Sequence, residues 1–176
     1  MSLLDQIAKM DISADQLAGL ESKDLIRIEK RLKAEARMNP DFDTNAVEQI
    51  LNVLKNNAEE LALFYQSQYK YLRDIIACKA DFVVFPPSSV RLENPSVEMI
   101  AFVSSNFKAE LRRYANRCLV EDHYRALNAF LCFHAVFDSE LKDELTQKLK
   151  QKLNYLVEVI RIRSQQLRKK IEPAMN

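Results

Sequence analysis

The chain has 176 residues, 48% hydrophobic and 29% charged, a balance typical of a folded protein with a sizeable core. Its 26 Lys and Arg against 25 Asp and Glu give a net charge of +1, so no global field attracts nucleic acid or acidic ligands. The single glycine excludes the Gly-rich loops that bind nucleotide phosphates and argues against a hairpin-rich β fold.

The first 39 residues predict a small N-terminal helical unit. Residues 2–10 fit a short amphipathic helix, without the basic and apolar regions of a signal peptide. A longer helix is predicted from a cap at Ser22, with apolar residues at helical spacing and charged residues on a solvated face. Pro40 ends it. We therefore expect two domains, a helical unit at 1–39 and a helical bundle at 40–176.

A long central helix is predicted to follow. From Val47 to Ile75, apolar residues keep a spacing of three or four across roughly nine turns, with one polar lapse at Gln68. Apolar residues occupy more than one face of this stretch. We therefore expect one continuous helix at the centre of the bundle.

The next segment, residues 81–97, cannot be helical and reads DFVVFPPSSVRLENPSV. In one interpretation it is a connection whose apolar residues pack across a bundle end while the Pro-Pro pair stiffens it. In the other it is an extended binding edge that accepts a peptide strand through Phe82, Val84 and Phe85. Both interpretations remain open from the sequence.

Three further helical stretches are predicted. One enters at Asn94–Pro95, with Asn as the cap. After an interruption near Cys118–Asp122, residues 123–137 are apolar nearly all round and should be buried. The last helix, 139–172, carries apolar residues at alternating spacings of four and three, as in a coiled-coil seam.

The fold class that these patterns predict is all-α. We expect a bundle of long antiparallel helices, a small N-terminal helical unit, and one long non-helical connection at about 80–95. The predicted core residues are Leu51, Leu54, Leu61, Phe64, Phe102, Phe107, Phe130, Leu149, Leu153 and Leu156.

Cysteine and histidine placement predicts no metal site and no cofactor. The three cysteines are odd in number and lack metal-ligand spacing, which is typical of reduced, buried thiols in a cytoplasmic protein. No apolar run is long enough to span a membrane. His123 and His134 lie eleven residues apart, roughly 16 Å on one helix, too far to share a metal. His134 is predicted to be a buried, hydrogen-bonded core histidine.

One short stretch resembles a catalytic motif. Arg117 and His123 enclose the sequence RCLVEDH, which is similar to the Arg-x4–6-His motif of HEPN-type helical ribonucleases. The resemblance covers seven residues and implies that the arginine contacts phosphate and the histidine transfers a proton, in a dimer. Cys118 stands where a polar residue is common in the family. The alternative is that both residues flank a helix break, paired with Glu121 or Asp122.

Charge is concentrated near the C-terminus. Residues 148–170 hold eight basic side chains and one acidic one, whereas residues 41–60 are acidic. This basic end could bind an acidic protein, RNA or DNA, or pair with the acidic segment of a second copy. The candidate binding residues there are Arg161, Arg163, Arg168, Lys169 and Lys170.

The function that the sequence favours is a non-enzymatic protein–protein interaction module, acting as a scaffold, adaptor or regulator. Apolar residues lie on more than one side of the last helix, which predicts a homodimer built antiparallel on it. The alternative is a HEPN-like ribonuclease or nucleic-acid-binding protein that uses Arg117, His123 and the basic C-terminal helix.

Overall fold

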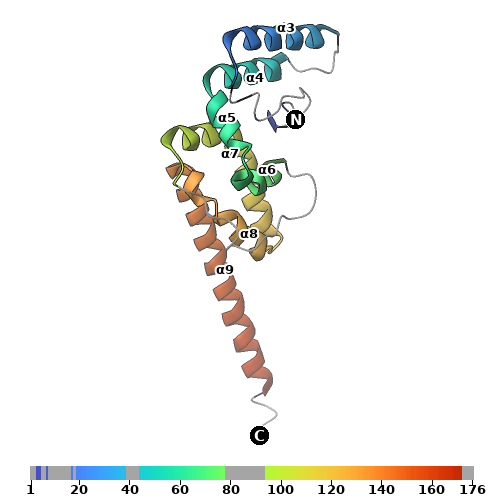
Figure 1. The fold of residues 1–176 in the computed structure, drawn as a ribbon. Helices are drawn as coiled ribbons and strands as arrows, with labels where there is room; N and C mark the ends of the chain where they lie inside the picture. Colours follow the sequence, from blue (N-terminus) through green and yellow to red (C-terminus); the bar gives the residue numbers. More distant parts are fainter. Residues whose placement is uncertain are drawn as a thin grey trace. The chain divides into compact units, whose positions relative to one another are not determined.

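A computed structural model describes residues 3, 4, 7, 17, 19–38, 44–77 and 94–171, the side chains of 44, 46 and 168–171 excepted. All regular structure in this part of the chain is helical (Figure 1), which confirms the all-α prediction. The elements are α3 (Ser22–Met38), α4 (Thr44–Asn56), α5 (Ala58–Phe64), η1 (Ser67–Tyr69), α6 (Lys70–Ala77), α7 (Val97–Val120), α8 (Tyr124–Leu131), η3 (His134–Val136) and α9 (Ser139–Ile171).

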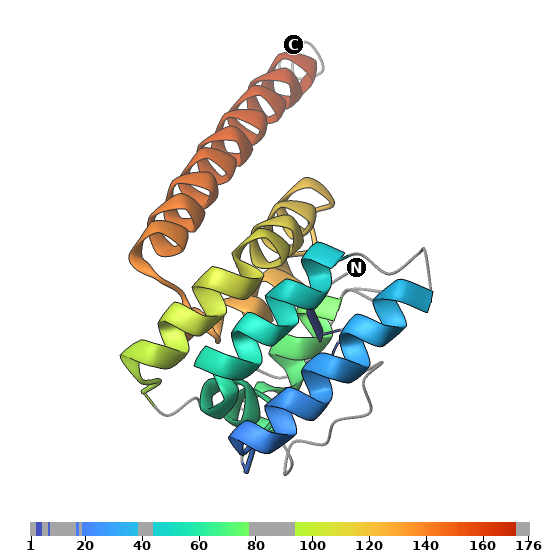
Figure 2. The same cartoon turned by 90° about the horizontal axis from the view of Figure 1, so that it is seen from above.

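The chain divides into two compact units between Asp138 and Ser139. The first unit, Met1–Asp138, contains every element up to η3, and the second unit, Ser139–Asn176, contains α9. Within the first unit, α3 packs against α4 and runs antiparallel to it, as Figures 1 and 2 show. The domain boundary predicted at 39–40 lies outside the described residues and stays a prediction.

The expected continuous central helix is wrong, because the chain breaks twice. Asn57 separates α4 from α5 with a φ of −139°, and Gln66 is extended with a ψ of 159°. The second break turns Tyr69 inward, where it is 4% exposed and its ring centroid lies 5.5 Å from that of Phe64. Arg73 Nη1 donates hydrogen bonds to two carbonyl oxygens at this break, those of Phe64 and Gln66. The polar lapse in the sequence pattern therefore marks a helix break.

The core of the first unit is built on packed aromatic rings. Phe107 stacks on Phe64 with the ring centroids 5.2 Å apart, and Phe102 meets both rings edge-on. A second group joins Phe130 to Tyr114 and Phe137, with centroids 5.5 and 4.9 Å apart. The predicted core residues of this unit are all confirmed as buried, namely Leu51, Leu54, Leu61, Phe64, Phe102, Phe107 and Phe130.

Helix α7 begins later than predicted and ends where predicted. Its cap is Ser96, whose Oγ accepts the N–H of Met99 at 3.1 Å, so the expected cap at Asn94 is wrong. At the other end Asp122 takes a φ of 58°, and the His123 N–H donates to the Cys118 carbonyl at 2.9 Å. This is the bonding of a Schellman helix end, with Asp in the left-handed position usually held by Gly.

The stretch after α7, residues 123–137, is buried only in part, and its exposed residues include Tyr124, Asn128 and His134. Phe130, Phe133 and Phe137 are at most 1% exposed. His134 is exposed, and its Nδ1 lies 3.1 Å from the Leu131 carbonyl oxygen, so its predicted hydrogen bond is confirmed but its burial is wrong. The 3₁₀ turn that starts at His134 changes the side-chain period and turns this residue outward. None of the described helices combines the length and apolarity that a membrane crossing needs.

Candidate functional site

The most distinctive surface of the described chain lies on α9, a helix of 33 residues that is roughly 50 Å long. Leu141 and Leu145, in its first two turns, are buried. Leu153 is 62% exposed, which makes the prediction of a buried Leu153 wrong. The predicted core residues Leu149 and Leu156 are half-buried. The apolar pattern of α9 therefore continues beyond its buried part.

Four exposed apolar residues share one side of this helix. They form the α9 stripe, which consists of Leu153, Val157, Ile160 and Leu167. Their spacings of four, three and seven keep them within about one third of the helix circumference, since each residue turns by roughly 100°. Sequence reasoning missed Val157, although its spacing to Leu153 and Ile160 gives the signal.

Other exposed apolar residues of α9 do not extend this stripe. Tyr155 is 62% and Ile162 43% exposed, and their positions place both on the opposite side of the helix. Lys152 Nζ lies 5.8 Å from the Tyr155 ring centroid, close enough for a cation–π contact. These two residues therefore serve as natural controls for the stripe.

Charge is distributed unequally along α9. Acidic Glu140, Asp143 and Glu144 lie in its first two turns. Farther along, Arg161 donates two hydrogen bonds to Glu158, at 2.9 and 2.7 Å, and this bonding lowers the pKa of the Glu158 carboxyl. Arg163 is exposed and occupies a seam position between apolar residues. The helix is thus acidic near its start and basic in its second half.

Several predicted binding residues fall outside the description. The side chains of Arg168, Lys169 and Lys170 lie outside the described residues, as do Phe82, Val84 and Phe85 of the predicted connection. Both interpretations of residues 81–97 therefore stay open.

The two residues of the HEPN-like motif meet at a single carboxylate. Arg117 Nε lies 3.2 Å from one oxygen of Glu121, and His123 Nε2 lies 3.8 Å from the other. The alternative prediction of pairing with Glu121 is therefore confirmed. Nearby, the Tyr124 hydroxyl donates to Asp122 at 2.6 Å. Each of these contacts lies at the turn between α7 and α8, where it holds the helix end together.

The described cysteines are free thiols of different exposure. Cys118 is fully buried, and burial raises the pKa of its thiol to about 11. A thiol with this pKa is almost entirely protonated at neutral pH and is a poor nucleophile. Cys132 is half-buried, and Cys78 lies outside the described residues. Within the described ranges no three His, Cys, Asp or Glu side chains are grouped to hold a metal ion.

Comparison with known proteins suggests no function for this chain, so a functional argument depends on its own surfaces, chiefly the α9 stripe. No protein-family model, curated protein or solved structure matches this chain. The stripe is an extended apolar surface on a single helix, and such surfaces mark sites of protein association.

Proposed function

We propose that this protein is a non-enzymatic helical interaction module that self-associates through the α9 stripe. The observation that carries the proposal is the exposure of Leu153 and Ile160, which are 62% and 64% exposed at coiled-coil spacing. An apolar stripe at this spacing packs well against a second helix of the same kind. Such an assembly would suit a scaffold or adaptor.

A second copy of the chain is the proposed occupant. A stripe with heptad spacing is complementary to itself, and closed two-fold dimers are the commonest protein oligomers. Fully burying one apolar side chain contributes about 1.5–3 kcal/mol, so the eight stripe residues of two copies contribute at most roughly 12–24 kcal/mol in a dimer. Association itself costs about 4–15 kcal/mol. The dimer should therefore depend on protein concentration.

The charge distribution along α9 supports antiparallel pairing. A parallel pair would set two Arg163 side chains against each other in an apolar seam, which is unfavourable. In an antiparallel pair with Leu153 facing Leu156 of the partner and Ile160 facing the partner's Leu149, Arg163 comes within one helical turn of the partner's Asp143, and Leu167 lies beyond the apolar contact. Opposite charges then meet at both ends of the pair.

Sedimentation equilibrium over about 1–200 μM protein tests the self-association. We expect a mass near 20.4 kDa at the lowest concentration and near twice that value at the highest. The double variant Leu153→Asn/Ile160→Asn should stay monomeric. The matched control Tyr155→Asn/Ile162→Asn changes the opposite side and should dimerise normally. A monomeric wild type at 200 μM, or equal loss in both variants, would refute the proposal.

A charge exchange tests the orientation. Asp143→Arg should weaken the antiparallel dimer about tenfold, and adding Arg163→Asp should restore it, because the exchanged charges still meet. In a parallel dimer residues 143 and 163 of the two copies lie far apart. Arg163→Asp would then not restore the dimer affinity that Asp143→Arg had lowered.

A further inference from the structure

A second surface lies on α3, in the first unit, and it is independent of the proposed self-association. The helix carries six basic and three acidic residues over 17 positions. Lys23, Arg27, Lys30 and Arg37 follow each other at spacings of four, three and seven, so they lie along one side. All four are exposed. These residues are called the α3 basic face, and exposed Arg31 and Lys33 border it.

The acidic residues around this face already have partners, and of the four residues of the face only Lys23 is among those partners. Arg27, Lys30 and Arg37 make no ion pair with any described residue, whereas each nearby acid has a partner. The acidic contacts are Glu21 with Lys23 at 2.7 Å, Glu29 with Lys33 at 2.6 Å and Lys55 at 3.3 Å, Glu35 with Arg31 at 2.9 Å, and Asp24 with the Glu21 N–H at 3.3 Å. Three unneutralised cations therefore remain in a line.

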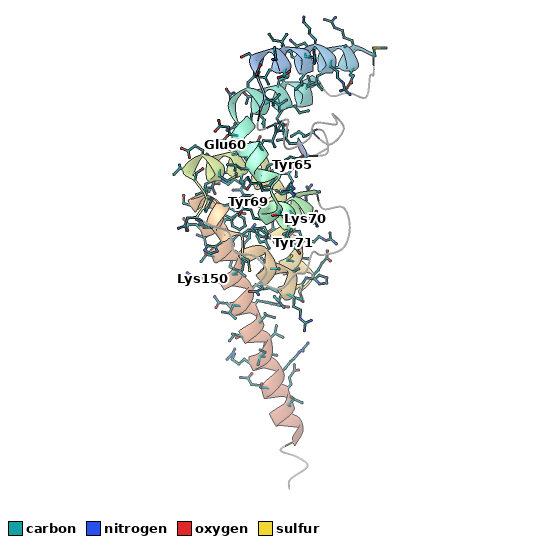
Figure 3. All side chains as sticks on the ribbon, viewed as in Figure 1. Glu60, Tyr65, Tyr69, Lys70, Tyr71 and Lys150 are labelled. Carbon is teal, nitrogen blue, oxygen red and sulfur yellow. The ribbon has the colours of Figure 1, made fainter. Side chains whose placement is uncertain are left out.

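The apolar side of α3 is occupied by packing. Leu32 is 1% exposed, and Leu25 and Ile28 are half-buried, on the side where α3 meets α4. Figure 3 shows that several side chains of α3 project from its side away from α4. A helix that inserts into a membrane surface needs a free apolar side. The exposed large apolar residues of α3 are Ile26, 55% exposed, and Met38, 86% exposed, which lie twelve positions and roughly 120° apart on the helix and so form no continuous apolar side. A lipid surface is therefore the weaker match.

We propose that the α3 basic face binds the phosphate backbone of double-stranded nucleic acid without reading its sequence. Its four cations span 14 residues, roughly 21 Å of rigid helix, which suits contact with three or four phosphates of a duplex. The helix has no aromatic residue on which unpaired bases could stack and no Asn or Gln to contact adenine. The expected contacts therefore position the protein but do not specify a base sequence.

Fluorescence anisotropy with a labelled duplex of about 20 base pairs tests the full-length protein. Three phosphate contacts predict a slope of log affinity against log salt near −2.7, which is a loss of roughly 40-fold between 50 and 200 mM salt. The triple variant Arg27→Gln/Lys30→Gln/Arg37→Gln should bind at least about tenfold more weakly and lose most of this slope. Gln is a good helix former, and unchanged circular dichroism would confirm that α3 persists.

A matched control removes the same charge from α9. The variant Lys150→Gln/Lys152→Gln/Arg161→Gln, which leaves the proposed dimer contact of Arg163 intact, should bind duplex within about twofold of the wild type, because the proposed contacts are all on α3. A charge-preserving variant, Arg27→Lys/Arg37→Lys, should also retain binding. Equal loss in both triple variants would assign the effect to net charge or to α9 and overturn the proposal. It is equally overturned if the wild type ignores duplex at 50 mM salt, or binds only phosphatidylserine vesicles.

Discussion

Replacing Phe107 by alanine removes the ring that joins the aromatic core of the first unit. Phe107 is 0% exposed, stacks on Phe64 at 5.2 Å and meets Phe102 edge-on at 5.7 Å. A buried Phe→Ala change costs about 3–5 kcal/mol through lost burial and the cavity left behind. Two aromatic pairs are lost as well, each contributing about 0.5–1.5 kcal/mol beyond its buried area. We therefore expect a loss near the upper end, about 4–5 kcal/mol.

Urea unfolding followed by near-ultraviolet circular dichroism measures this loss, because Tyr69 and Tyr114 are packed in the same unit. With a denaturant dependence of about 2 kcal/mol per molar urea, the midpoint should fall by roughly 2 M. Phe107→Leu keeps most of the volume and should cost only about 1–2 kcal/mol. The control Leu63→Ala, at a 43% exposed position of the same unit, should cost less than about 1 kcal/mol. A Phe107→Ala cost no larger than that of the control would refute the packing argument.

Three further predictions concern single contacts. Asp138→Asn should lower the free energy of unfolding by about 1–3 kcal/mol, because it removes one anionic partner of Lys108, which is 18% exposed and 2.8 Å away. Asp74→Asn, in an exposed pair, should cost below about 0.5 kcal/mol in the same urea titration. Arg73→Met removes the donor of both hydrogen bonds to backbone carbonyls at the second helix break, so hydrogen exchange there should accelerate without loss of α7 protection. Burial raises the pKa of Cys118 from 9 to about 11, so the folded state retains a proton that the unfolded state releases. The free energy of unfolding should therefore fall between pH 9 and about 11, and Cys118→Ala should flatten that decline. An unchanged slope in the variant would contradict the burial argument.

The sequence predicted a helix well where the spacing of its apolar residues reflects burial of one helix face. The buried stripe of α7 includes Phe102 and Phe107, whose spacing follows directly from burial of one helix face. The break at Gln66 was not predicted, because an inward Tyr69 and a continuing helix produce similar apolar spacing. The cap at Ser96 was also missed. Asn94 lies just before Pro95 and Ser96 just after it, and both residue types are acceptable caps, so residue type alone does not choose between them.

The candidate site shows a different limit. A regular apolar stripe indicates that a helix has a partner, but it does not say whether that partner lies in the same chain. Leu145 and Leu153 follow the same pattern, and one is 4% and the other 62% exposed. The charged face of α3 was predicted to be solvated, and its ion pairs become visible only when neighbouring side chains such as Lys55 are placed. Composition cannot separate engaged from unengaged charges.

The exposed second half of α9 links helix formation to protein concentration. From Leu153 to Leu167 no residue is buried, so these turns have only their own backbone hydrogen bonds and local side-chain pairs for support. Helical segments of this length are marginally stable in water when nothing packs on them. Dissociation of an α9 pair should therefore fray these turns, and dilution should lower the helical signal together with the mass. The length of ordered helix would then report how abundant the protein is.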